Sequence, residues 1–123
     1  MLRSLLKMLR LAVLLATVPV AASHAVPVVR IASMLTQPIY VASPPGDERL
    51  FVVERGGTVR ILQGEQVLPT AFLDISDRVD QQGEGGLMSI AFAPDYASSR
   101  AFYLFYTTTG NPLTTRISRF RAN

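Results

Sequence analysis

The sequence of 123 residues contains no cysteine. A chain without cysteine folds without disulfides, so burial of apolar side chains alone must hold it together if it is exported. The same absence excludes the cysteine-linked lipid anchor of bacterial lipoproteins.

Histidine and lysine are almost as scarce. The only histidine is His24 and the only lysine is Lys7. Both lie within residues 1–25, a segment with the features of a removable export signal. The remaining chain therefore has no imidazole to act as a base, a metal ligand or a pH switch. This excludes every mechanism in which residues 26–123 supply a catalytic histidine.

Residues 1–25 have the order of a secretory signal peptide. A basic region comes first, residues 11–20 are apolar, and small side chains close the segment. We expect cleavage after Ala25, or alternatively after Ala22, and a mature protein that is periplasmic or secreted. The basic residues are Arg3, Lys7 and Arg10.

A transmembrane anchor is the competing interpretation of this segment. Within the predicted signal, the segment after Arg10 has only 15 residues, 11–25, and is interrupted by Pro19, whereas a membrane span needs about 20. We therefore expect no membrane attachment after cleavage.

Removal of the signal changes the charge balance. The whole chain has 12 basic and 9 acidic residues, and three of the basic ones leave with the signal. Nine arginines then face nine acidic residues, so the mature net charge is zero. The high isoelectric point belongs to the signal and gives no support to binding of nucleic acid or of a membrane surface.

The mature chain shows no helical periodicity and is predicted to be all-β. Short runs of β-branched and aromatic residues alternate with turns, such as Pro44–Asp47 and the hairpin turn Gly56–Gly57. The expected strands are residues 39–43, 50–54, 58–62, 72–75, 87–92, 101–107 and 115–120.

The strands repeat. Residues 39–53 match residues 89–105 in their order of strand, proline turn and strand, with an offset of 50 to 52 residues, and a third strand follows in both. Such units are typical of β-propeller blades, although a β-sandwich also repeats strands and turns. The chain would hold one blade and most of a second. The open flank would expose roughly 500 Å² of apolar surface, which costs on the order of 10 kcal/mol, so we expect a fragment of a larger propeller.

The loop Gly83–Gly86 is the leading candidate site. Its glycines can take positive φ and bring Glu84 close to a ligand or to another strand. A carboxylate in such a place can accept a hydrogen bond from a substrate hydroxyl or act as a base, whereas the plainer alternative is a solvated loop residue. The loop leads into a strand and lacks the Lys-Ser/Thr end of a phosphate-binding loop.

Other residues carry weaker signals. An acidic cluster suggests calcium, but its spacing fits neither an EF-hand loop nor a compact cage, so no metal site is predicted. The charges of Glu54 and Arg55, in the hairpin, are expected to point outward or to pair. Three aromatic side chains are expected to pack between blades. The cluster is Asp74, Asp77, Asp80 and Glu84, and the aromatic residues are Tyr103, Phe105 and Tyr106.

From about Leu35 to Phe120 the chain is similar to the soluble quinoprotein glucose/sorbosone dehydrogenase family. No single segment is specific, but their ordered set is. The matching segments are Pro38, residues 50–60 (LFVVERGGTVR), 72–79 (FLDISDRV), 83–87 (GEGGL), 91–96 (AFAPDY), 102–106 (FYLFY) and 115–120 (TRISRF).

The resemblance implies an exported six-bladed propeller that binds pyrroloquinoline quinone (PQQ) and calcium and oxidises aldose sugars at the anomeric carbon. In the family a histidine takes the hydroxyl proton while hydride passes to the quinone, and arginines and a lysine hold the cofactor. Those groups follow the region covered here. The resemblance therefore implies an N-terminal fragment, residues 26–123, that has no catalytic residue, binds neither cofactor and is inactive by itself.

In the family the loop equivalent to Gly83–Gly86 reaches the top of the central tunnel, where a Gln or Glu contacts the substrate or the cofactor edge. The resemblance thus implies that Glu84, Gly85 and Gly86 line the substrate or cofactor site. Glu adds a charge where the glucose-oxidising members have Gln, which leaves the sugar preference open. The alternative function is a non-catalytic extracellular propeller that binds a partner, as in the propeller that captures hedgehog ligands.

Overall fold

The computed structural model describes residues 25–110 and 112–123. The predicted signal peptide, including His24, lies outside the described residues except for Ala25. Among the described residues, no helix combines the length and the apolar character that a membrane crossing requires.

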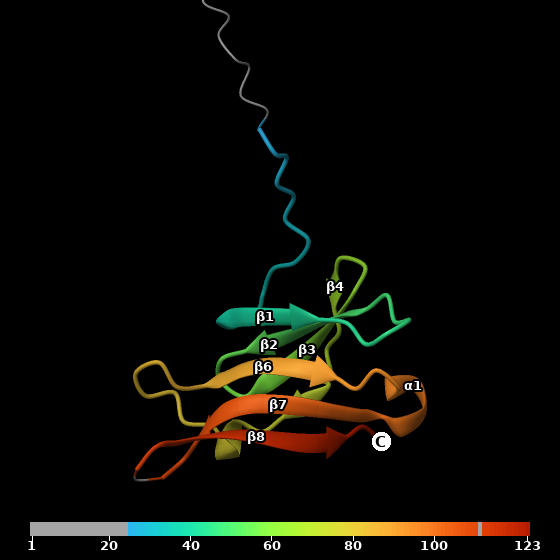
Figure 1. Cartoon of the computed structure of the whole chain (residues 1–123). Helices are drawn as coiled ribbons and strands as arrows, with labels where there is room; N and C mark the ends of the chain where they lie inside the picture. Colours follow the sequence, from blue (N-terminus) through green and yellow to red (C-terminus); the bar gives the residue numbers. More distant parts are fainter. Residues whose placement is uncertain (1–24, 111) are drawn as a thin grey trace, which may run out of the picture.

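The structure consists of two antiparallel sheets (Figure 1). One has five strands in the order β1-β2-β3-β4, with β5 also paired to β3, and the other has the order β6-β7-β8. The all-β prediction is confirmed. The strands are β1 (Pro38–Ala42), β2 (Leu50–Glu54), β3 (Thr58–Gln63), β4 (Gln66–Val67), β5 (Leu73–Asp74), β6 (Leu87–Phe92), β7 (Ala101–Thr108) and β8 (Thr114–Arg121), with short helices η2 (Ser76–Arg78) and α1 (Tyr96–Ser99).

Most predicted boundaries hold to within one residue. The main differences are local. The fourth predicted strand, residues 72–75, is shortened to β5 because Ile75 already leads into η2. The short strand β4 and the helix α1 were not predicted: two residues are too few for a periodic signal, and α1 is a single turn that follows Pro94 and Asp95.

The predicted repeat is visible in the topology. In each sheet three successive strands pair in sequence order, β1 to β2 to β3 and β6 to β7 to β8. Both first strands carry a register irregularity near their beginning, between Pro38 and Tyr40 in β1 and between Leu87 and Ser89 in β6. Figure 1 shows β1 and β6 as neighbours where the two sheets meet, and both β1 and β2 contact β6.

The core lies between the sheets. Alternate residues of β2 and β3 face it from one side, and alternate residues of β7 face it from the other, as the period-two pattern of a strand requires. Rings pack edge to face here: the Phe51 ring centroid lies 4.9 Å from those of Phe72 and Phe92, and such pairs add about 0.5–1.5 kcal/mol each beyond area burial. The core residues are Phe51, Val53, Val59, Ile75, Val79, Leu87, Ile90, Phe102, Leu104 and Tyr106.

The aromatic residues of β7 divide between the two faces of its sheet. Tyr106 is buried between the sheets, and its hydroxyl lies 3.2 Å from Ser118 Oγ. Tyr103 and Phe105 point to the opposite face and keep 39% and 38% of their surface exposed. The expectation of packing between blades is therefore met within the described chain by Tyr106 but not by the other two.

Gly57 is the point at which the β2–β3 hairpin touches the chain that follows β5. Its φ is +111°, and a Cβ there would lie 2.7 Å from Ser76 Cα. Its carbonyl accepts the Ile75 N–H at 2.9 Å. Gly64, in the turn between β3 and β4, also has positive φ (+60°) but has open space around it.

Gly57→Ala is expected to lower the thermal midpoint more than Gly64→Ala. Both variants strain the backbone, by about 1–3 kcal/mol each, but only the methyl group added by Gly57→Ala would also collide with neighbouring backbone. Scanning calorimetry of the two variants of the complete protein, beside the wild-type complete protein, measures the difference. Equal losses would contradict the close approach at Gly57.

Candidate functional site

The predicted site lies at the end of the molecule where β2 and β7 end and β3 and β6 begin. The loop before β6 is stabilised by hydrogen bonds between its own residues. The Gln82 N–H donates to Asp80 Oδ1 at 2.7 Å, and the Gly85 N–H donates to the Gln82 carbonyl at 2.8 Å. These bonds fold residues 80–86 into a tight turn.

The glycines of this loop are required for different reasons. A Cβ on Gly85 would lie 2.7 Å from the Asp80 carbonyl oxygen, and a Cβ on Gly86 would lie 2.5 Å from Arg55 Cγ. Gly83 has open space but a φ of +55°, which L side chains adopt at a cost. The close approach expected from these glycines is thus an approach to Arg55 in the other sheet.

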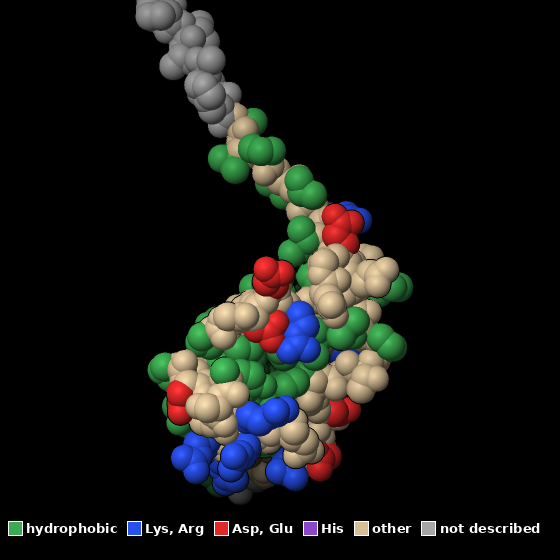
Figure 2. All heavy atoms as spheres, turned by 90° about the vertical axis from the view of Figure 1, so that its right-hand side faces the viewer, with side chains coloured by type: hydrophobic (Ala, Val, Ile, Leu, Met, Phe, Trp, Pro, Cys, Tyr) green, Lys and Arg blue, Asp and Glu red, His purple; other side chains and the backbone are tan. Residues whose placement is uncertain are grey.

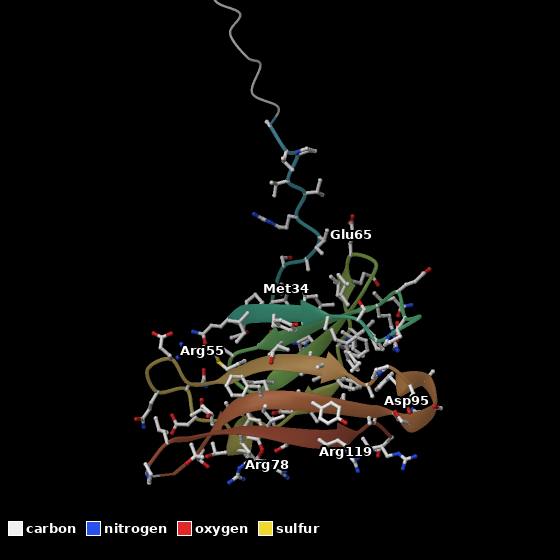
Figure 3. The ribbon with its side chains drawn as sticks, in the orientation of Figure 1. Met34, Arg55, Glu65, Arg78, Asp95 and Arg119 are labelled. Atoms are coloured by element: carbon white, nitrogen blue, oxygen red, sulfur yellow. The ribbon has the colours of Figure 1, made fainter. Side chains whose placement is uncertain are left out.

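Arg55 crosses from the β2–β3 hairpin to the glycine loop, and Figure 3 shows it at this end of the molecule. Its Nε donates to the Gly85 carbonyl at 2.8 Å, and its Nη2 donates to the carbonyls of Gln81, at 2.9 Å, and Gly83. The expectation that this charge points outward or pairs with an acid is wrong. Its partners lie 26 to 30 residues further along the chain, beyond the reach of any local sequence signal.

The expectation that the charge points outward or pairs is also wrong for Glu54. Its side chain is buried, with 5% of the residue exposed. The carboxylate accepts the Thr36 N–H at 2.7 Å and the Thr58 hydroxyl. Buried charges must be compensated by hydrogen bonds or ion pairs, and here the chain before β1 supplies part of that compensation.

Glu84 stands at the tip of the loop and is exposed. Among residues 25–110 and 112–123, its side chain has no hydrogen-bond partner and no ion-pair partner. It lies on an open hollow of about 500 Å³, so its oxygens are accessible to a ligand. Gly85 shares this hollow, whereas Gly86 is buried against Arg55. The hollow is lined by Gln82, Gly83, Glu84, Gly85, Thr107, Leu113 and Thr115.

The other acidic residues of the predicted cluster have separate local roles. Asp74 Oδ1 accepts the Ser76 N–H at 3.0 Å, and this backbone hydrogen bond lowers the Asp74 pKa. Asp80 holds the loop turn, and Asp77 lies 3.9 Å from Arg78 Nε. Within the described part of the chain, no group of three or more histidine or acidic residues is placed to hold a metal ion.

A larger hollow, of about 620 Å³, lies at the opposite end of the strands, beside α1. Two of its charged residues pair: Arg49 Nη2 donates to Asp47 Oδ2 at 2.6 Å, and this hydrogen bond lowers the Asp47 pKa. The guanidinium also lies 5.4 Å from the centroid of the Phe51 ring. The pair braces the β1–β2 loop, and the exposed carboxylate Glu48 also lines this hollow.

Figure 2 views that opposite end. Hydrophobic side chains gather in the middle of the face, and basic side chains lie along its lower edge, where Figure 1 places β8. Three arginines of β8 are exposed: Arg116, Arg119 and Arg121.

Comparisons with known proteins agree with this architecture. The model of the glucose/sorbosone dehydrogenase family matches residues 35–123. Human hedgehog-interacting protein is 37% identical over 84 residues, which are 63% of this chain and 12% of that protein. Aldose sugar dehydrogenase YliI of Escherichia coli is 32% identical over 77 residues, which are 63% of this chain and 20% of the enzyme.

A solved structure of an aldose sugar dehydrogenase also resembles this chain. The PQQ-bound aldose sugar dehydrogenase of Streptomyces coelicolor superposes with a TM-score of 0.61 and 32% identity, covering 72% of this chain and 25% of that one. This chain therefore spans only about an eighth to a quarter of the length of these relatives. The two sheets correspond to blades of a β-propeller, which confirms the predicted architecture over the sandwich alternative. With its strand repeat and a family match from residue 35 to residue 123, the chain belongs to the glucose/sorbosone dehydrogenase family.

Proposed function

We propose that this chain is the N-terminal part of an exported, six-bladed quinoprotein sugar dehydrogenase that oxidises an aldose by hydride transfer to PQQ. The observation that carries the proposal is the family match over residues 35–123, together with aldose sugar dehydrogenases among the relatives. The chain spans only 20–25% of those two enzymes, so the proposal concerns the complete protein.

Among the described residues, we propose Glu84 as the group that contacts the substrate. Glu84 is an exposed carboxylate on a braced loop, suited to accept a hydrogen bond from a sugar hydroxyl. The described chain offers no metal-binding cluster, and Arg55 is already bonded to backbone carbonyls. We propose that the groups that bind PQQ and calcium, and the catalytic base, belong to the rest of the complete protein; PQQ, when bound, would supply the hydride acceptor.

The complete protein, supplied with PQQ and calcium, is expected to reduce an electron-accepting dye in the presence of aldoses. The family's chemistry at the anomeric carbon sets this expectation, and dye reduction across a panel of aldoses measures it. Protein without PQQ is the control. Failure with every sugar of the panel would contradict the proposed activity.

A second candidate is a non-catalytic extracellular binding module. The 37% identity to hedgehog-interacting protein favours it, because one propeller can carry either a catalytic or a recognition surface. The residues beyond Asn123 distinguish the two. A histidine followed by glycines before the next blade, with a later lysine and arginine pair, would favour the enzyme.

Glu84→Gln in the complete protein is expected to lower kcat/KM for the preferred aldose by about tenfold, because a hydrogen bond to a charged group is worth about 1.5–3 kcal/mol. The melting temperature is expected to stay nearly unchanged, since the side chain is exposed. Glu65→Gln, another exposed glutamate, on the β3–β4 turn (Figure 3), is the matched control. Lower stability with unchanged kinetics would assign Glu84 to the scaffold instead.

Residues 26–123 produced alone are expected to show neither cooperative thermal unfolding nor dehydrogenase activity. Apolar side chains on β1 and on the outer face of β7 and β8 remain exposed to water. Circular dichroism during heating measures the unfolding, with light scattering to confirm a monomer. A single sharp transition of the monomer would contradict this prediction. The exposed side chains are Ile39, Tyr40, Val41, Tyr103, Phe105 and Ile117.

A further inference from the structure

We propose that Arg55 is a positioning residue that holds Glu84 at the mouth of the site, so that the site is assembled across two sheets. The guanidinium belongs to the β2–β3 hairpin, whereas the loop that it binds leads into β6. The part of the inference that concerns sugar oxidation rests on the proposed function. The part that concerns the loop rests on the contacts alone.

The first support is the set of acceptors. Arg55 donates to the carbonyls of Gln81, Gly83 and Gly85, which lie on both sides of Glu84 in the chain. A guanidinium has five N–H donors in a rigid, planar fork, whereas a lysine ammonium is a point charge on a flexible stem. Binding of three carbonyls fixes the backbone of a glycine-rich turn that has little intrinsic stiffness.

The second support is the way Arg55 itself is anchored. Its N–H donates to the Gln37 carbonyl at 3.0 Å, and its carbonyl accepts the Leu87 N–H at 2.9 Å. Gly86, without a Cβ, lets the arginine stem lie directly on the loop backbone. The Gly86 carbonyl in turn accepts the Thr107 N–H at 2.9 Å. The guanidinium is thus supported by both sheets.

The third support is the absence of a competing role. Among residues 25–110 and 112–123, the ion pairs are Arg49–Asp47 and Arg78–Asp77, and neither involves Arg55. Its donors are directed to loop carbonyls instead of a carboxylate. The arrangement therefore orders a backbone segment whose exposed member is Glu84.

The test uses the complete protein with Arg55→Met and Arg55→Lys. Hydrogen exchange of the peptide covering residues 80–87 is measured without cofactor, and kcat and KM for the preferred aldose are measured with PQQ and calcium. Arg78→Met is the matched control, because Arg78 is exposed and its ion-pair contact is the long one, at 3.9 Å.

Arg55→Met is expected to speed exchange in residues 80–87 about tenfold, the effect of losing about 1.4 kcal/mol of local stability. Arg55→Lys is expected to restore part of the protection. With the aldose, Arg55→Met is expected to lower kcat/KM as Glu84→Gln does, and the double variant to fall no further than Glu84→Gln alone, since one residue acts through the other.

Unchanged exchange in both Arg55 variants would overturn the proposal, and so would independent, additive losses in the double variant. If Arg55→Met fails to fold, the same two measurements on Arg55→Lys test the proposal. A wild-type protein that oxidises no aldose would count against the proposed function and not against the role of Arg55. In that case the hydrogen-exchange rates measured without cofactor show by themselves whether Arg55 holds the loop.

Discussion

The packing of the two sheets through their apolar faces is the constraint on which the rest of this structure depends. The chain has no cysteine, so no disulfide links the sheets. Alternate side chains of β2 and β7, such as Phe51 and Leu104, are almost completely buried between them. Dispersion and the removal of apolar area from water therefore supply the cohesion, and the relative position of every loop follows from this contact.

This packing also positions the candidate site. Because β2 lies against β6, the hairpin that ends β2 comes to rest beside the loop that begins β6. Arg55 and the glycine loop then exchange hydrogen bonds across the junction. Glycine at positions 85 and 86 is what allows the two backbones to approach so closely. The one freely accessible carboxylate of the loop, Glu84, thus stands on a support built from both blades.

The outer faces of the two blades have the opposite character. Val41 on β1 and Ile117 on β8 expose 53% and 73% of their surface, although both belong to regular strands. Contiguous exposed apolar surface usually marks a contact with another structural unit. In a propeller each blade packs against two neighbours, which agrees with a chain that spans a fifth to a quarter of its dehydrogenase relatives. The architecture alone does not decide between catalysis and binding, and the chain is similar in sequence both to an aldose sugar dehydrogenase and to hedgehog-interacting protein.

The sequence by itself determined the strands, the repeat and the position of Glu84 on a glycine-rich loop. These features depend on alternation and on glycine and proline, which act over a few residues. Only the tertiary structure decided that Glu54 is buried and that Arg55 holds the loop. One partner of Glu54, Thr36, lies 18 residues away, and the partners of Arg55 lie 26 to 30 residues away, so these contacts arise only when the chain has folded. Glu54 and Arg55 are neighbouring charged residues of one hairpin, but the fold buries the first and directs the second to the glycine loop.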